Sequence, residues 1–240
     1  MLHLTLNRPD KRNAIDAAMV DALLEQLAAA DLAAGVRVIS IRGAGSDFCA
    51  GADLGELLAS VDQSAEANVA GAERLGRVFT LVREMPKPVV AVVHGRALAG
   101  GCGLATACDM ILARDDATFG YPEVHRGFVP AMVLGLLRRA VGEKVAFDLV
   151  ATGRPVTAGQ ALELGLISRV IPAGQFETDA AHVLADLAAL SPSALALTKR
   201  LLYAVDTADF EAAIALGARV NAVARGTPDF KEAVEKFLKR

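Results

Sequence analysis

Phe48-Cys49-Ala50-Gly51-Ala52-Asp53-Leu54 is one of two glycine-rich segments that decide the fold of this chain. The other is His94-Gly95-Arg96-Ala97-Leu98-Ala99-Gly100-Gly101-Cys102-Gly103-Leu104. Each follows an apolar run and precedes helix-forming residues, a pattern that predicts a strand, a turn and a helix. A turn that opens a helix leaves backbone N–H groups without partners. Two such turns that face each other would form an oxyanion hole, which holds an oxygen atom that becomes negative during a reaction.

A third segment, Phe119-Gly120-Tyr121-Pro122-Glu123, offers one carboxylate that could move protons. Taken alone, a glutamate that follows a proline in a polar turn is more often a solvated surface group. Glu123 therefore becomes a catalytic candidate only in combination with the two glycine turns.

The composition predicts a globular chain with a large core. It has 240 residues, of which 53% are hydrophobic and 22% charged, enough for one large domain or a domain with an appendage. The net charge is −3 and both signs are scattered, so nothing favours binding to nucleic acid or to an anionic membrane. Aromatic residues make up 5% of the chain and Trp is absent, which also argues against a surface on which bases stack.

Three cysteines, Cys49, Cys102 and Cys108, indicate the compartment. Their odd number and their spacing fit neither a disulfide framework nor a zinc site, so we expect reduced thiols in a cytoplasmic protein. No histidine is placed to act as a partner for a catalytic thiol, and we interpret the three residues as small packing groups. No signal sequence and no run as long as a membrane span is visible.

Apolar runs alternate with helical patterns along the first two thirds of the chain, which predicts a mainly parallel sheet with crossover helices. Residues 56–85 are polar and helical in propensity, and predict either a solvated helix pair or a mobile cover over a site. The predicted strands are residues 2–6, 36–41, 89–93, 110–113 and 166–171.

From Pro130 onward, the chain is predicted to be nearly all helix. We divide the chain into a core domain, residues 1–190, and a C-terminal helical assembly region, residues 191–240. Residues 210–240 carry apolar positions at helical spacing, which suits either an assembly surface or a plain core helix.

Five motifs in this order resemble the crotonase superfamily, that is, the enoyl-CoA hydratase/isomerase family, over nearly the whole chain. They are Asn7-Arg8-Pro9, Ala50-Gly51-Ala52-Asp53-Leu54, the glycine turn at 99–103, Ala107-Cys108-Asp109 and Pro122-Glu123. The resemblance implies an α/β fold, the crotonase-like (ClpP/crotonase) spiral of ββα units with a helical C-terminal trimerisation region. It also implies a homotrimer or a dimer of trimers. The family usually begins with one more strand before Leu2, so a shorter form is expected here.

The resemblance further implies acyl-CoA substrates, with coenzyme A as part of the substrate, no metal and no redox cofactor. The two oxyanion donors of the family fall on the backbone N–H groups of Ala52 and Gly100, and one catalytic glutamate falls on Glu123. The second glutamate is missing, because a typical hydratase has Gly-Gly-Gly-Cys-Glu where this chain ends the motif in Gly103. The adenine and pantetheine of coenzyme A would run along Ala14, Ala50, Asp53 and Leu54.

One carboxylate suits a double-bond shift better than hydration, because a single base can remove a proton from Cα and return it at Cγ. Hydration stays equally open, since one glutamate could both activate water and deliver its proton, or another acid could enter the site from residues 56–85. Two further alternatives are other enolate chemistry, such as decarboxylation or thioester hydrolysis, and a non-catalytic acyl-CoA-binding protein.

Overall fold

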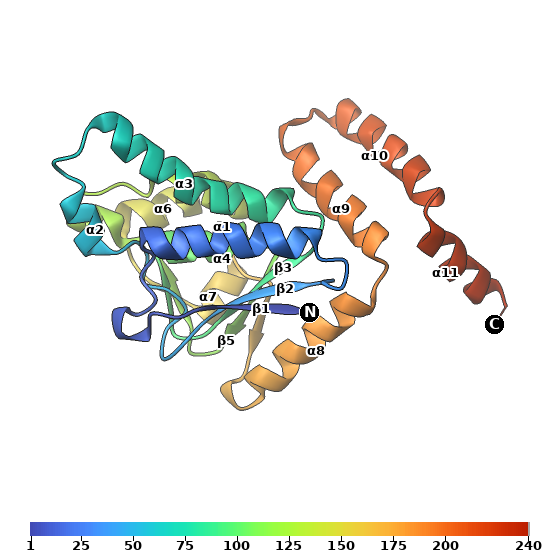
Figure 1. Cartoon of the computed structure of the whole chain (residues 1–240), viewed down its shortest axis with the longest axis horizontal. Coiled ribbons are helices and arrows are strands. Elements are labelled where there is room, and N and C mark those ends of the chain that lie inside the picture. The colour runs from blue at the N-terminus through green and yellow to red at the C-terminus, as the bar shows by residue number, and fades with distance from the viewer. Residues whose placement is uncertain (240) are drawn as a thin grey trace.

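A five-stranded parallel sheet forms the centre of the computed structural model, which describes residues 1–239 (Figure 1). Its spatial order is β1-β2-β3-β5-β8, and every neighbouring pair is parallel, as the alternation of strands and helices predicts. Two predicted strands begin three residues too early, since the chain joins the sheet only at Ile39 and at Arg169. The strands are β1 (Leu2–Leu6), β2 (Ile39–Gly43), β3 (Val89–Val93), β5 (Met110–Arg114) and β8 (Arg169–Ile171).

Both faces of this sheet are buried, which explains why β3 is a continuous apolar run. Val89, Ala91 and Val93 belong to the larger hydrophobic cluster. Val90 and Val92 point to the other face and pack in a second cluster that includes residues of α8 (Phe176–Ala189). Successive side chains of a strand alternate between faces, so each face receives its own apolar set.

A second, three-stranded sheet was not predicted. It has the order β4-β6-β7, with β4 (Arg96–Leu98) parallel to β6 (Thr118–Gly120) and β6 antiparallel to β7 (Val156–Thr157). Strands of two or three residues are too short to show an alternating pattern, and this is why the sequence does not reveal them.

Helices cover both faces of the central sheet (Figure 1). Residues 56–85 form the predicted helix pair, α2 and α3, interrupted near Ser64, whose side chain accepts a hydrogen bond from the N–H of Ala67 and so caps α3. The helices before the C-terminal region are α1 (Ala17–Leu32), α2 (Leu54–Ala59), α3 (Ala65–Glu84), α4 (Gly100–Ala107), α5 (Ala131–Ala140), α6 (Glu143–Thr152) and α7 (Ala158–Glu163).

The C-terminal region contains α9 (Pro192–Ala204), α10 (Phe210–Arg225) and α11 (Pro228–Leu238). A buried lysine of α9, Lys199, ties that helix to the body of the protein through an ion pair with Asp109 at 2.7 Å. Beyond α9, helices α10 and α11 project away from the sheet (Figure 1). The amphipathic stretch at 210–240 is thus two helices, and Arg240 lies outside the described residues.

No single helix within residues 1–239 is long and apolar enough to cross a membrane. Ala173–Ala189 and Pro192–Thr207 meet the criteria of length and hydropathy only as a pair, and the pair is bent by 101° at its break.

Candidate active site

Three parallel segments bring the glycine turns and the candidate glutamate to one edge. The N–H of Leu98 donates to the carbonyl oxygen of Cys49 at 2.9 Å, on one side of β4. On the other side of β4, the N–H of Ala99 donates to the carbonyl oxygen of Gly120 at 2.8 Å. Because parallel segments end at the same edge, residues 50–53, 99–100 and 121–123 are neighbours there.

The backbone N–H groups of Ala52 and Gly100 lie next to each other at this edge. A Cβ atom built on Gly100 would be 3.8 Å from the nitrogen of Ala52, and one built on Gly51 would be 3.5 Å from the nitrogen of Gly100. Within residues 1–239 neither N–H donates a backbone hydrogen bond outside the regular helices and strands. Gly100 is the first residue of α4, where the N–H has no partner inside the helix. Two adjacent free donors are the arrangement that an oxyanion hole requires.

Unusual backbone conformations aim these two donors. Gly51 has φ +100°, and Ala99 has φ 49° with ψ −126°, a conformation that L-residues with a side chain rarely adopt. The conformation of Ala99 persists because its N–H and its carbonyl oxygen are both held, by Gly120 and by the N–H of Gly103. Strain of this kind is typical of functional sites, where the surrounding structure over-determines the backbone.

Glu123 lies in the 3-10 helix Pro122–Arg126, directly after β6, and is only 9% exposed. Its Oε2 atom is buried and makes no hydrogen bond to any described residue. Burial raises the pKa of this carboxyl above its ordinary value, against smaller lowering contributions from its own backbone N–H and from Arg126. The negative charge of Glu123 also makes a small contribution to the raised pKa values of Cys102 and Tyr121. A buried carboxylate with a free oxygen and a raised pKa is suited to accept and return a proton.

The space around Gly103 is filled by apolar side chains. A Cβ atom at this position would lie 2.2 Å from Cγ1 of Val133 in α5 and 3.5 Å from the ring of Phe79 in α3. Gly100 and Gly103 are three residues apart on α4 and share a helix face, so this apolar wall adjoins the donor pair. The Cβ atom of a glutamate at this position would overlap the side chain of Val133, so the family's second glutamate would require Val133 to move or to be replaced.

Gly103→Ala should destabilise the protein by about 1–3 kcal/mol, because the new methyl group must displace the stiff side chain of Val133. The loss should be visible in urea unfolding, and Val133→Ala in the same chain should recover part of it. Gly71→Ala is the matched control, since a Cβ atom at Gly71 meets nothing within 4 Å. Equal midpoints for Gly103→Ala and the wild type would contradict this packing.

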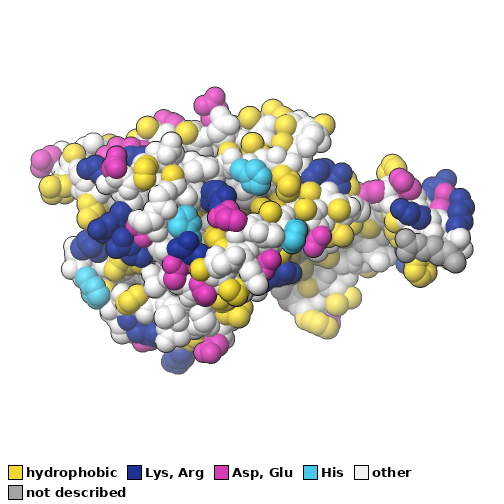
Figure 2. All heavy atoms as spheres, turned by 90° about the horizontal axis from the view of Figure 1, so that it is seen from below, with side chains coloured by type: hydrophobic (Ala, Val, Ile, Leu, Met, Phe, Trp, Pro, Cys, Tyr) yellow, Lys and Arg dark blue, Asp and Glu magenta, His cyan; other side chains and the backbone are white. Residues whose placement is uncertain are grey.

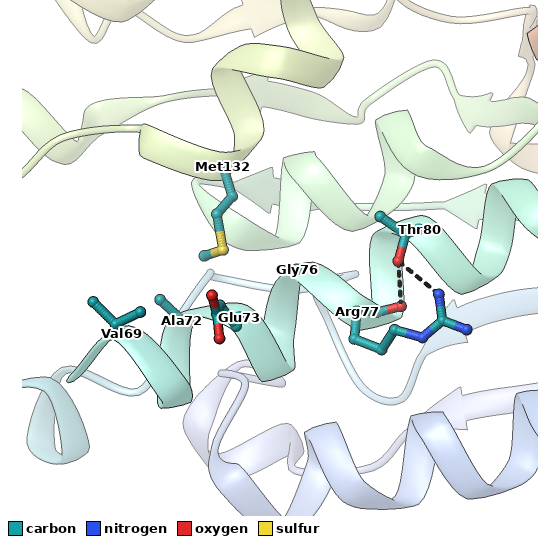
Figure 3. Close-up of a pocket in the computed structure, with 7 residues that line it drawn as sticks. All are labelled: Val69, Ala72, Glu73, Gly76, Arg77, Thr80 and Met132. Carbon is teal, nitrogen blue, oxygen red and sulfur yellow. Dashed lines mark hydrogen bonds between the residues drawn. The ribbon is translucent and has the colours of Figure 1, made fainter. Parts of the chain in front are cut away.

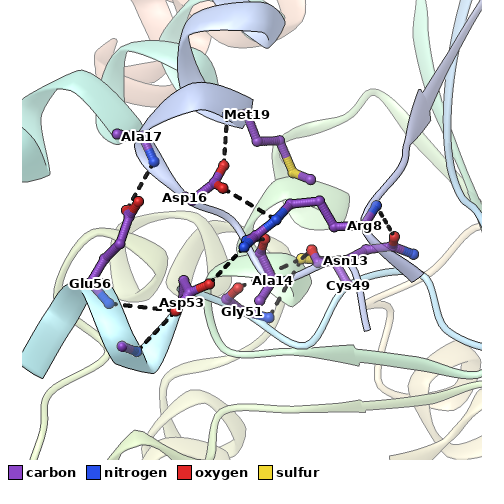
Figure 4. Close-up of polar contacts among 11 residues, drawn as sticks. Arg8, Asn13, Ala14, Asp16, Ala17, Met19, Cys49, Gly51, Asp53 and Glu56 are labelled. Atoms are coloured by element: carbon purple, nitrogen blue, oxygen red, sulfur yellow. Dashed lines mark hydrogen bonds and ion pairs between the residues drawn. The ribbon is translucent and has the colours of Figure 1, made fainter. Parts of the chain in front are cut away.

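Two of the four residues expected to line coenzyme A, Ala14 and Asp53, lie close to Gly51 (Figure 4). The other two, Ala50 and Leu54, flank this turn in the chain. The N–H of Ile15 donates to the carbonyl oxygen of Gly51 at 2.7 Å, which sets the loop containing Ala14 against the first glycine turn. Asp53 accepts hydrogen bonds from the N–H groups of Gly55 and Glu56 and so caps α2. Leu54 is 57% exposed, so this part of the lining faces the surface.

An open groove of about 450 Å³ runs between α3 and α5 (Figure 3). Gly76 leaves space opposite Met132, whose Sδ atom would be 3.4 Å from a Cβ atom at that position. The preceding residue, Leu75, lies 4.0 Å from a Cβ atom at Gly100. Leu75 itself does not line the groove, whose lining is mostly apolar. Its residues are Val69, Ala72, Glu73, Gly76, Arg77, Thr80 and Met132.

The cysteines and the flanking histidines have structural surroundings. Burial raises the pKa of Cys49 to about 12 and that of Cys102 to about 11, and all three thiols are free and buried. Thiolates, the reactive form, are therefore disfavoured. His94 and His125 bind the backbone carbonyl oxygens of Gly45 and Thr152, at 2.9 and 2.8 Å.

Sequence reasoning missed three groups: Val133 with Phe79, Lys199, and the ion pairs that Arg8 makes with two aspartates. In the sequence, Arg8 stands out only as part of a motif. A signal for its ion pairs is nevertheless present, because Asp16 and Asp53 both stand at positions where helix caps are expected. The apolar wall and the lysine carried no local signal.

The sequence profile of the enoyl-CoA hydratase/isomerase family matches residues 1–240. A Thermus thermophilus protein with a provisional enoyl-CoA hydratase name is 42% identical over 98% of this chain and 93% of that protein. The 2,3-dehydroadipyl-CoA hydratase of Escherichia coli is 34% identical over 100% of this chain and 92% of its own length. A crystal structure of an enoyl-CoA hydratase from Mycobacterium smegmatis superposes with a TM-score of 0.95, at 33% identity, over 99% of this chain and 92% of the other.

Proposed function

Because the chain belongs to the enoyl-CoA hydratase/isomerase family, we propose that it moves a proton on an enoyl-CoA thioester with Glu123 as the single acid–base group. The thioester oxygen would lie between the N–H groups of Ala52 and Gly100. The observation that carries this proposal is the adjacency of two free backbone donors at the edge that also holds Glu123, a buried carboxylate whose Oε2 atom makes no hydrogen bond to a described residue.

The first reaction proposed is the shift of a 3,4 double bond to the 2,3 position. Glu123 takes the proton from C2, and the C–H electron pair passes into the C1–C2 bond while the carbonyl oxygen becomes negative. The two N–H donors stabilise that oxygen, and losing one donor typically costs about 10²–10³ in rate. The carbonyl then reforms, the C2–C3 double bond forms as the C3–C4 double bond is lost, and C4 takes the proton from Glu123. The glutamate ends as it began, as a carboxylate.

The apolar side chains around Gly103 are the reason for proposing the double-bond shift before hydration. Hydration needs both an activated water and a proton at Cα, and with no side chain at Gly103 both tasks would fall to Glu123 or to an acid from residues 56–85. Hydration is the second candidate, and it is supported by the printed names of the Thermus thermophilus and Escherichia coli relatives.

The test is a mass-resolved assay with 3-hexenoyl-CoA and crotonyl-CoA in water enriched in heavy oxygen. Conversion of 3-hexenoyl-CoA without oxygen uptake, at a rate that depends on Glu123, is the expected result. Oxygen uptake from crotonyl-CoA at a greater rate would make hydration the main reaction. If neither thioester reacts, the proposed proton transfer is wrong for enoyl-CoA, and other enolate chemistry or a non-catalytic binder takes its place.

We also propose that α10 and α11 form the assembly surface of a homotrimer or a dimer of trimers. Both helices project from the body (Figure 1), and Figure 2 shows apolar side chains on the projecting part of the molecule. Large apolar side chains along them are exposed to solvent in a single chain, and patches of this kind usually mark an interface. A second copy of the same chain is the occupant that this proposal assigns. The exposed residues are Phe210, Ile214, Val223, Phe230, Val234, Phe237 and Leu238.

Ile214→Asp should shift the protein from an oligomer to a monomer, because a carboxylate would have to be buried in the interface. Ile214 is 61% exposed in the single chain, so the substitution should leave the folded monomer intact. Light scattering after size-exclusion chromatography measures the mass. Leu32→Asp, an exposed leucine at the end of α1, is the control that should keep the oligomer. An unchanged mass for Ile214→Asp would contradict the assignment.

A further inference from the structure

Arg8 joins the loop that contains Ala14 and Asp16 to the turn that contains Gly51 and Asp53 (Figure 4). Its guanidinium binds Asp53 at 2.9 Å through Nη2 and Asp16 at 3.2 Å through Nε. Its Nη1 atom donates to the carbonyl oxygen of Ala14 at 2.6 Å. The side chain of Arg8 is 27% exposed and those of both aspartates are 17% exposed, so these contacts are largely removed from water.

Each aspartate has a second task at the start of a helix. Asp16 accepts from the N–H of Met19 and caps α1, while Asp53 caps α2. Glu56 of α2 in turn accepts from the N–H of Ala17, the first residue of α1. Arg8 therefore closes a ring of polar contacts that holds the beginnings of α1 and α2 side by side.

The turn that contains Ala52 is held inside this ring. The N–H of Asp53 donates to the carbonyl oxygen of Ile15 at 2.8 Å, and Ile15 donates back to Gly51. Residues 51 and 53 are thereby held from the side of Ile15, which leaves the N–H of Ala52 directed away from that segment. The orientation of this donor thus depends on how the loop at 14–16 lies against the turn at 51–53. The two backbone bonds of Ile15 join these segments, and Arg8 adds side-chain contacts to both.

We propose that Arg8 is a positioning residue for the reaction, acting through Asp16 and Asp53 to aim the N–H of Ala52 at the thioester oxygen. Without its guanidinium, two carboxylates would face each other with no cation between them, and their repulsion would separate the two loops. The pKa of Asp53 is lowered, mainly by its bond to Arg8, which agrees with an interaction that favours the charged carboxylate. This inference rests on the proposed function, because it takes Ala52 as an oxyanion donor.

Arg8→Met tests the inference. The variant should lower kcat by about 10- to 100-fold. This loss does not exceed the decrease of about 10²–10³-fold that is typical when a complete oxyanion donor is removed. A second substitution, Asp16→Asn in the Arg8→Met chain, should restore at least part of kcat, because it removes the repulsion while asparagine still caps α1. Arg42→Met is the matched control: Arg42 forms an ion pair with Glu177 away from this site, and its loss should leave kcat unchanged. A purely structural role would lower the melting temperature without changing kcat per folded molecule.

Amide hydrogen exchange supplies a readout that does not depend on activity. In Arg8→Met, the N–H groups of Ala50 and Asp53, which donate to Arg12 and Ile15, should exchange at least about 10-fold faster. Unchanged exchange and unchanged kcat would overturn the inference. Faster exchange with no turnover in the wild type would instead overturn the proposed function and leave the positioning of the turn intact. A loss of kcat that Asp16→Asn does not relieve would show that charge repulsion is not the cause.

Discussion

Glu123→Gln should reduce kcat by about 10²–10⁴-fold, because it removes the only group proposed to carry the proton. Gln has nearly the same shape as Glu but cannot accept a proton at neutral pH. Substrate binding should change little, since the thioester is held by backbone donors and by the loops that would line coenzyme A. The measurement is steady-state turnover of 3-hexenoyl-CoA together with its KM.

The same substitution should not lower stability, and this separates a catalytic loss from unfolding. Burial raises the pKa of Glu123 in the folded protein above its value in the unfolded chain. The native state therefore holds the proton more tightly, so the contribution of Glu123 to stability is present below its ordinary pKa and lost as pH rises through the raised pKa. At neutral pH the wild type buries a charge that Gln does not carry. We expect Glu123→Gln to be at least as stable as the wild type at pH 7.5, as is common for residues kept for activity.

The pH profile gives an independent check on Glu123. As a base it must be ionised, so kcat/KM should fall on the acid side at a pH above the ordinary glutamate pKa of about 4.3. Full activity of Glu123→Gln would contradict the assignment. So would a decrease of kcat/KM that begins only at the ordinary pKa of a glutamate. Glu123→Asp, which keeps the carboxylate but withdraws it from the site, should fall between the wild type and Glu123→Gln.

Lys199→Met should destabilise the protein by about 3 kcal/mol, because it leaves the carboxylate of Asp109 without its cation. Lys199 is 7% exposed, and besides Asp109 it donates to the carbonyl oxygens of Val82 at 2.7 Å and Lys87 at 2.9 Å. Asp109 keeps two other donors, the N–H of Val89 and the hydroxyl of Tyr203. We therefore expect a loss at the lower end of the range of about 3–5 kcal/mol that is usual when one partner of a buried ion pair is removed. Burial lowers the pKa of Lys199, against the opposing effect of Asp109, which agrees with a charge held in poor solvent contact.

Thermal and urea unfolding at one protein concentration measure this effect, and a loss of 3 kcal/mol corresponds to about 6–12 °C in a chain of this size. Lys231→Met is the matched control, since Lys231 lies in α11 at 3.9 Å from Glu235 and is exposed. Its loss should cost less than about 1 kcal/mol. Adding Asp109→Asn to Lys199→Met should recover part of the loss, because the uncompensated charge is then removed. Equal effects of Lys199→Met and Lys231→Met would contradict the role given to the buried pair.

Local patterns in the sequence located the five strands of the central sheet, two of them to within three residues, and Asp53 stands at a position typical of a helix cap. Val89–Val93 is an unbroken apolar run, and this composition by itself predicts a strand buried on both faces. Asp53 precedes a helix-forming stretch, and its side chain caps α2 as such a residue is expected to do. These features depend on residues two to four positions apart, so the sequence contains all that determines them. The resemblance of five ordered motifs to a known family then correctly identified the fold and the family, which the comparisons show.

Only the tertiary structure decided which of these local features meet. The small sheet of β4, β6 and β7 places the turn at 50–53 beside residues 99–100 and Glu123, although its strands are too short to be seen in the sequence. Gly103 could be recognised as a departure from the family, but the occupation of its space by Val133 depends on how α5 packs against α4. Lys199 and Asp109 are 90 residues apart in the chain, and nothing near either one indicates the other. Contacts of this kind arise from packing and register over the whole chain, whereas periodicity and capping arise from neighbours along it.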